Sequence, residues 1–166
     1  VRSGYVIIDK PKGLSSAVVV GRVKRALGAV KVGHAGTLDP DATGLLVCLV
    51  NGATKIAPYI HEGIKVYEGT FRFGVTTSSD DMTGRVLTSS DSIPSEHEVR
   101  EVLPSFLGEI QQIPPRVSAI QIDGRRAYDL ERKGAEFELA ARTVVVHSIE
   151  LKKVESTLYA YRISCG

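Results

Sequence analysis

The sequence predicts an α+β fold, in which strands of the hairpin type and a few separate helices share one chain. Three observations lead to this class. The chain has 166 residues, of which 43% are hydrophobic and 24% are charged, as in ordinary globular domains with a buried core. Several segments alternate apolar and polar residues with the period of a strand. The helical patterns fall at irregular places between these strands, which does not fit regular βαβ winding.

The first part of the chain predicts a strand, a helix and a second strand. Residues 5–8 form a short apolar run that is followed by proline and glycine, which end strands. Ser15 or Ser16 can cap a helix whose apolar residues recur at helical spacing, and Gly28 ends that helix. The apolar run 45–50 has the length of a strand, although its periodicity alone does not exclude a helix.

The middle of the chain predicts a helical stretch followed by a hairpin-like region. Residues 53–63 look helical, but Pro58 interrupts them. Residues 65–74 alternate as a half-buried strand does, with aromatic and β-branched residues that favour strands. The polar stretch 76–84 is rich in turn residues, and a short strand is expected at 85–89.

The last part of the chain predicts a capped helix and two paired strands. Ser95 and Glu98 form a capping box at the start of a helix, which Pro104 should kink or end. Residues 117–134 predict a strand, a turn and a short basic helix. The final strands are expected at 142–155 and 157–164 and should pair. The last strand runs to the end without a turn or cap, so we expect a truncated chain.

Composition narrows the possible classes of protein. The longest apolar stretch, LLVCLV, is too short to span a bilayer, and no signal-peptide pattern opens the chain. Cys48 and Cys165 make no disulfide framework, which favours a reducing cytoplasm. Between residues 1 and 34, seven Lys and Arg residues stand against one acid. This basic segment could face a polyanion, and a solvated surface with no partner explains the charge equally well.

Asp39 is the main candidate for chemistry, and two interpretations of it stay open. Asp before Pro is a good helix start, so the carboxylate could simply cap the next element. However, Gly33 and Gly36 lie close to His34 and give a backbone that can approach a ligand. The chain has no phosphate-binding glycine motif, no Cys/His spacing typical of zinc and no G-x-S-x-G elbow. Because these motifs are missing, the sequence gives no support for a zinc site, a phosphate-binding loop or a hydrolase triad.

Five segments resemble, in the same order, the bacterial tRNA pseudouridine synthase B family. The signature segment is GHAGTLDPDATGLL, which contains Asp39. The other four are DKPKGLSS, KVYEGTFRFGVTTSSDDMTG, QIPPRVSAIQIDGRRAYDLERKG and ARTVVVHSIEL. The resemblance covers essentially the whole chain. It implies a catalytic domain with a mixed, mainly antiparallel central sheet and flanking helices.

The resemblance also implies an activity and roles for several residues. The family isomerises the T-loop uridine at position 55 of tRNA to pseudouridine, without a cofactor or a metal. Asp39 matches the nucleophilic aspartate of the family. His34 matches a histidine that takes up the position left by the flipped base, and Tyr67 matches a tyrosine that stacks on that base. Lys10 and Pro11 match residues that support the aspartate loop and have no chemical role.

Basic residues of this chain are expected to contact the phosphates of the T arm, giving salt-dependent affinity without sequence readout. The candidates are Arg22, Lys24, Arg25, Lys31, Arg125, Arg126 and Lys133. We accordingly expect tRNA as the partner, with no membrane and no small-molecule cofactor, and a cytoplasmic monomer.

The resemblance implies that residues 1–166 are the catalytic domain without its C-terminal part. In the family, a motif with a tyrosine beside the base and an arginine paired with the aspartate follows the last strand. A small RNA-binding domain of the PUA type comes after it. We expect both to be absent here and these 166 residues alone to be inactive. Two other functions stay open: a non-catalytic RNA-binding or tRNA-folding module, and a related synthase that acts on ribosomal RNA.

Overall fold

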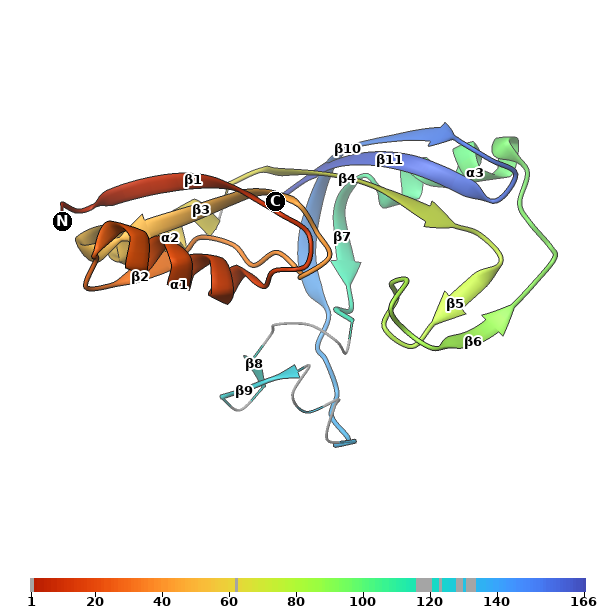
Figure 1. Ribbon diagram of the computed structural model, residues 1–166. Helices are drawn as coiled ribbons and strands as arrows, with labels where there is room; N and C mark the ends of the chain where they lie inside the picture. The colour runs from red at the N-terminus through yellow and green to blue at the C-terminus, as the bar shows by residue number, and fades with distance from the viewer. Residues whose placement is uncertain (1, 62, 116–120, 123, 128–129, 131–133) are drawn as a thin grey trace. The chain divides into compact units, whose positions relative to one another are not determined.

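The structure is a computed structural model that describes residues 2–61, 63–115, 121–122, 124–127, 130 and 134–166. The chain divides into two compact units, Val1–Gly63 and Ile64–Gly166. Figure 1 shows the elements of each unit along the chain. Strands and a few helices alternate irregularly, and every described strand pair is antiparallel. The α+β class and the mainly antiparallel pairing predicted from the sequence are confirmed.

The first unit is built on a three-stranded antiparallel sheet in the order β1-β3-β2. Its strands are β1 (Gly4–Lys10), β2 (Val32–His34) and β3 (Gly44–Val50). The apolar run that could have been a strand or a helix is therefore strand β3. The structure also adds β2, a three-residue strand that the sequence pattern did not predict.

Helix α1 (Ser16–Leu27) follows β1 and is fixed at both ends by its own sequence. The hydroxyl of Ser15 accepts a hydrogen bond from the Val18 amide at 3.3 Å, so Ser15 is the N-cap. Gly28 ends the helix in the left-handed conformation with φ of 57°, which glycine adopts without strain. Both ends were predicted from the sequence, although the choice between Ser15 and Ser16 was not.

The core of the first unit lies between α1 and the sheet. Four side chains form its buried centre, Val19, Val23, Leu46 and Cys48. Leu38, in the loop between β2 and β3, packs against this cluster as a partly buried residue. Burial of a few such side chains contributes about 1.5–3 kcal/mol each and anchors the loop before Asp39 to the core.

The helical stretch predicted with an interruption at Pro58 consists of two short elements. The 3₁₀ helix η1 (Asn51–Ile56) leads into α2 (Ala57–His61). Pro58 lies in the first turn of α2, where its missing amide is not needed for a helical hydrogen bond. The proline therefore marks the place where one helix type changes to the other.

The second unit is built on a four-stranded antiparallel sheet in the order β4-β11-β10-β7. Its strands are β4 (Lys65–Arg72), β7 (Gly108–Gln112), β10 (Arg142–Lys153) and β11 (Leu158–Cys165). The predicted pairing of the last two strands is confirmed, with an irregularity between Val146 and Ser148. Strand β7 was not predicted from the sequence.

The two faces of this sheet differ in character. On one face, the ring of Phe71 stacks on that of Tyr159 at 5.8 Å and meets Phe73 edge-on at 5.1 Å. On the other face, Glu68 and Arg162 form an ion pair between adjacent strands. Because neighbouring residues of a strand point to opposite faces, the alternation seen in the sequence of β4 produces this division.

Short elements complete the second unit. Helix α3 (Glu96–Val102) has the predicted capping box, and it passes at Leu103 into the 3₁₀ helix η2 (Leu103–Phe106), which contains Pro104. Two small hairpins pair β5 (Val75–Thr77) with β6 (Val86–Ser89) and β8 (Gln121–Ile122) with β9 (Arg125–Arg126).

The segment 117–134 was predicted to form a strand, a turn and a short basic helix, and the structure adds strand β9 between the turn and the helical residues Ala127 and Leu130. Arg125 and Arg126 form a strand that returns along β8 through a turn at Gly124, where φ is +77°. Residues 117–120, 123, 128, 129 and 131–133 of this predicted motif lie outside the described residues. Among the described residues, no helix is long and apolar enough to cross a membrane.

Candidate active site

Asp39 lies on the loop that joins β2 to β3 in the first unit. Its backbone carbonyl accepts a hydrogen bond from the Ala42 amide at 3.1 Å, which closes a four-residue turn. Pro40 occupies the second position of that turn, where its fixed φ is favourable. Strand β3 begins at Gly44, so no helix starts at Asp39 and the alternative of a helix cap is excluded.

The carboxylate of Asp39 is free to meet a ligand. Asp39 is an exposed residue, and its side chain makes no hydrogen bond or ion pair with the part of the chain that the structure describes. An exposed carboxylate on a proline turn can serve as a nucleophile or as an acceptor for a bound molecule.

The backbone just before Asp39 is held by a serine of α1. The Leu38 amide donates to the hydroxyl oxygen of Ser16 at 2.9 Å, and that hydroxyl lies 2.9 Å from the Leu38 carbonyl, to which it donates. Ser16 is 2% exposed. The sequence suggested only a helix cap for this serine, so its contact with the loop is a finding of the structure.

The backbone just after Asp39 is held by a buried lysine at the end of β1. The ammonium of Lys10 donates to the carbonyl oxygens of Pro40 at 3.1 Å, Pro11 at 3.0 Å and Leu14 at 2.8 Å. Three acceptors match the three donors of an ammonium group. The support of the aspartate loop by Lys10 that the resemblance implied is confirmed.

The amide of Gly13 adds a second hydrogen bond to the Pro40 carbonyl, at 2.7 Å. The segment between β1 and α1 therefore holds the residues on both sides of Asp39. A loop with such contacts is ordered by tertiary hydrogen bonds even though it lies outside helices and strands.

His34 lies at the start of the same loop. It is the last residue of β2, is partly buried, and pairs in register with Cys48 of β3. The Ala35 amide still donates to the Val47 carbonyl at 3.0 Å, and the chain then leaves the sheet at Gly36. The φ of Gly36 is +142°, which side chains rarely adopt. His34 thus lies where this loop begins, and Asp39 lies in the middle of the same loop in the first unit.

Tyr67 belongs to the second unit. It lies on β4 opposite Ile163 and is 44% exposed. Burial raises the pKa of the Tyr67 phenol, the nearby Cys165 raises this pKa further, and Arg142 lowers it. The phenol is therefore neutral at physiological pH and has a partly open ring. The structure thus brings His34 and Asp39 into one unit and places Tyr67 in the other.

The basic candidates are distributed over both units. Arg22, Lys24 and Arg25 are exposed on α1, and Lys31 is exposed just before β2. No carboxylate pairs with any of these four side chains in the described part of the protein. Arg125 is exposed on β9 and Arg126 is on the same strand. Lys133 lies outside the described residues.

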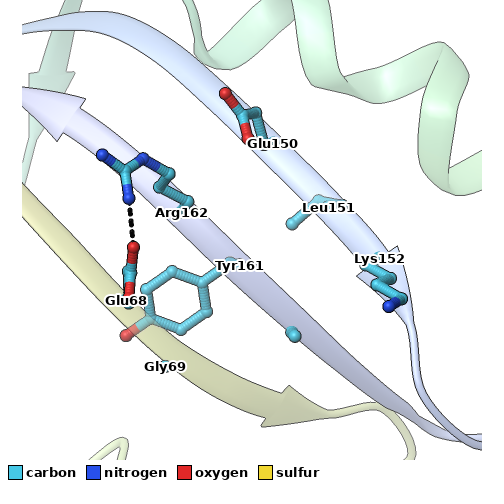
Figure 2. Close-up of a pocket in the computed structure, with 8 residues that line it drawn as sticks. Glu68, Gly69, Glu150, Leu151, Lys152, Tyr161 and Arg162 are labelled. Carbon is cyan, nitrogen blue, oxygen red and sulfur yellow. Dashed lines mark hydrogen bonds and ion pairs between the residues drawn. The ribbon is translucent and has the colours of Figure 1, made fainter.

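A shallow hollow of about 350 Å³ lies on the polar face of the second sheet. Figure 2 shows the Glu68–Arg162 ion pair between β4 and β11, with Glu150 on the neighbouring strand β10. None of the residues singled out from the sequence lines this hollow. Among the described residues, no group of three or more His, Cys, Asp and Glu side chains is arranged to hold a metal ion.

Comparison with known protein families gives one match that covers most of the chain. Residues 24–166 match the family described as "TruB family pseudouridylate synthase (N terminal domain)". The tRNA pseudouridine synthase B of Paracoccus denitrificans (strain Pd 1222) is 49% identical over 98% of this chain and 55% of its own length. That of Dinoroseobacter shibae (strain DSM 16493 / NCIMB 14021 / DFL 12) is 51% identical over 89% of this chain and 48% of its own length. The chain spans about half the length of the curated relatives it matches.

Solved structures share the fold. A chain in the "Crystal Structure of a Cbf5-Nop10-Gar1 Complex" matches 98% of this chain and 39% of its own length, with a TM-score of 0.68 and 26% identity. A chain in the "Structure of H/ACA RNP bound to a substrate RNA containing 2'-deoxyuridine" matches 98% of this chain and 37% of its own length, with a TM-score of 0.65 and 24% identity. At that level of identity, the second match supports the fold alone.

Proposed function

Because the chain belongs to the TruB family of pseudouridylate synthases, whose N-terminal domain it matches, we propose that it supplies the nucleophile-bearing part of a tRNA pseudouridine synthase. The substrate is the T-loop uridine at position 55 of tRNA. The reaction breaks the bond between ribose C1′ and uracil N1, turns the base and forms a bond between C1′ and C5. C5 loses a proton and N1 gains one, so the step consumes no water and transfers no electrons to a carrier.

One observation carries this proposal. The carboxylate of Asp39 is exposed and unpaired among the described residues, while the backbone on either side of it is held by buried polar side chains. A nucleophile needs an accessible charged oxygen in a fixed place, because misplacement by about 1 Å can reduce a rate a hundredfold. We propose Asp39 as that nucleophile.

His34 and Tyr67 handle the flipped base in this proposal. His34 takes up the space that the uracil leaves in the T loop, and the ring of Tyr67 stacks on the extruded base. Extrusion of a base costs a few kcal/mol, and stacking on an aromatic ring returns about 1–3 kcal/mol. The two side chains together therefore roughly offset the cost of extrusion.

The T arm of tRNA is the proposed partner, held through its phosphates. The exposed basic residues of the first unit supply the charge, together with the arginines of β9, and they are Arg22, Lys24, Arg25, Lys31, Arg125 and Arg126. Contacts of this kind fix the position of the RNA and weaken as salt rises. We further propose that the protein acts as a cytoplasmic monomer.

Replacement of Asp39 by asparagine tests the proposed function in the protein expressed from its complete reading frame. Tritium release from C5-labelled uridine in T-arm RNA measures the reaction, and RNA affinity is measured separately. Asp39→Asn should reduce tritium release about a thousandfold or more and leave affinity within about twofold. Asp41→Asn is the matched control, because Asp41 is exposed on the same turn and loses the same charge. Full activity of Asp39→Asn would exclude the nucleophile.

The two other functions give different results in the same assay. A non-catalytic RNA-binding or tRNA-folding module would bind T-arm RNA without tritium release in the wild type. A synthase for ribosomal RNA would release tritium from rRNA transcripts and not from tRNA transcripts. The tRNA specificity of the named relatives favours tRNA as the substrate of this chain.

A further inference from the structure

Ser16 uses its hydroxyl in a way that helix formation does not require. Ser15 already caps α1 through the Val18 amide, so the cap of this helix needs nothing from Ser16. The hydroxyl of Ser16 instead contacts the amide and the carbonyl of one loop residue, Leu38, each at 2.9 Å. The two neighbouring serines therefore have separate tasks, one within the helix and one toward the loop.

The contact of Ser16 has the pattern of strand pairing. The amide and the carbonyl of an extended residue point to the same side, and in a sheet both are satisfied by one residue of the neighbouring strand. A hydroxyl can replace that partner because it donates one hydrogen bond and accepts others. Ser16 thus satisfies both backbone groups of Leu38 at a place where β2 has ended and β3 has not begun.

Burial makes this contact specific. Ser16 is 2% exposed, and a buried hydroxyl without a hydrogen bond is costly, so loss of the contact with Leu38 would be unfavourable for both residues. The side chain of Leu38 is itself packed against the core of the first unit. Leu38 is therefore held by its side chain and by both of its backbone groups.

Asp39 is the single residue between two fixed points. Ser16 holds Leu38 on one side, and Lys10 together with Gly13 holds the Pro40 carbonyl on the other. The backbone position of Asp39 is thereby determined, and only its two side-chain torsions remain to orient an exposed carboxylate. Removal of the contact at Leu38 would free one of the two anchors of this residue.

From this geometry we propose that Ser16 is a positioning residue for Asp39. It acts through the backbone of Leu38 and touches no substrate. The proposal rests on the proposed function, because a positioning role has meaning only where Asp39 is the nucleophile. In this proposal Ser16 has a role in turnover, and Ser15 has a role in the stability of helix α1.

Ser16→Ala and Ser15→Ala form a matched pair that separates positioning from stability. Both remove one hydroxyl from adjacent residues at the start of the same helix, in the protein from the complete reading frame. The measurements are the single-turnover rate at saturating T-arm RNA, the Kd for that RNA and the thermal midpoint. Ser16→Ala should lower the rate about 10- to 100-fold with the Kd within about twofold. Ser15→Ala should lower the thermal midpoint and leave the rate unchanged.

Equal rates for the wild type and a folded Ser16→Ala variant would overturn the proposal, and so would equal losses of rate for the two alanine variants. Ser16→Cys covers the case in which the alanine variant does not fold, because the thiol has a similar shape and is a weak donor and acceptor. It should also lower the single-turnover rate, and a rate equal to that of the wild type would count against positioning. Absence of turnover by the wild type would instead refute the proposed function.

Discussion

Several side chains of the first unit satisfy backbone groups that no helix or strand satisfies. Lys10 and Ser16 hold the loop around Asp39, and Asn51 holds the connection between α1 and β2. The contacts join segments that are 20 to 30 residues apart. Because backbone groups without partners are costly when buried, such long-range contacts determine where an irregular loop can lie.

The contacts of this loop could not be predicted residue by residue from the sequence. The pattern SS predicted a helix cap within one residue, since Ser is a favoured N-cap type. The choice of Ser15 as the cap and Ser16 as the partner of Leu38 depends on a loop 22 residues away. The sequence singled out Asp39 as the main candidate for chemistry, but the contacts that hold the backbone on either side of it are visible only in the tertiary structure.

Asn51 provides a prediction about the stability of the first unit. Its side-chain oxygen accepts from the amides of Val30 and Lys31, each at 3.1 Å, and its backbone is left-handed with φ of 51°. Asn51→Ala should lower the free energy of unfolding by about 2–3 kcal/mol, because it removes two hydrogen bonds and strains the backbone. Urea denaturation measures this change. Asn51→Gly removes the acceptor without the strain and should fall between alanine and the wild type.

For Tyr159 we predict a substitution that increases the stability of the protein. The residue is 1% exposed, and its hydroxyl has no hydrogen-bond partner among the described residues. A buried polar group without a partner costs about 1–3 kcal/mol. Tyr159→Phe keeps the stacking on Phe71 and should raise the free energy of unfolding by about 1 kcal/mol in urea denaturation. A loss of stability would indicate a partner for this hydroxyl and contradict the prediction.

Elements with local signals were predicted well, and elements that depend on a neighbour were not. Helices α1 and α3 have caps that can be read from the sequence, and long strands such as β10 show clear patterns. Strand β2 has three residues, and β7 has the sequence GEIQQ, with one large apolar residue. These two strands form because β3 and β10 offer unpaired backbone groups, which no local pattern reports.

The hairpin of β5 and β6 has a turn organised by one carboxylate. Asp81 accepts from the hydroxyl of Ser79 at 2.7 Å, and from the amide of Thr83 at 2.8 Å and its hydroxyl at 2.7 Å. The hydrogen bonds from Thr83 and Ser79 lower the pKa of the Asp81 carboxyl. The ionised carboxylate of Asp81 therefore stabilises the turn. Its hydrogen bonds are fully present at any pH above the pKa that Asp81 has in the unfolded chain.

The pH dependence of this turn follows from the lowered pKa. The contact should be lost only as pH falls below about 3.9, through the lower pKa of the folded state. The chemical shift of the Thr83 amide, followed by NMR during acidification, measures this loss. In Asp81→Ala, the Thr83 amide should already have at pH 7 the chemical shift that the wild type reaches only in acid. Asp91→Ala, which removes a carboxylate from the loop after β6, should leave the Thr83 shift unchanged at pH 7. A Thr83 amide that shifts near neutral pH in the wild type would contradict the prediction.

On the scale of the whole chain, charge is distributed unevenly. The segment 1–34 has seven basic residues and one acid, while the segment 78–109 has seven acids against Arg85 and Arg100. In the described structure the basic side chains of α1 are exposed and unpaired, as a surface for a polyanion requires. The uneven charge is visible in the sequence. The structure adds that Arg22, Lys24 and Arg25 are exposed together on helix α1.

Salt dependence of RNA binding tests whether these charges act on phosphates. Arg22→Gln, Lys24→Gln and Arg25→Gln should each weaken the affinity for T-arm RNA severalfold and reduce the slope of log K against log salt by about 1. The rate at saturating RNA should not change, because phosphate contacts position the RNA and lie apart from the chemistry. Arg85→Gln is the control, since it removes the same charge from the acidic segment and should leave the slope unchanged. An equal loss of slope in Arg85→Gln would mean that RNA responds to the net charge of the protein, and α1 would then have no special place in binding.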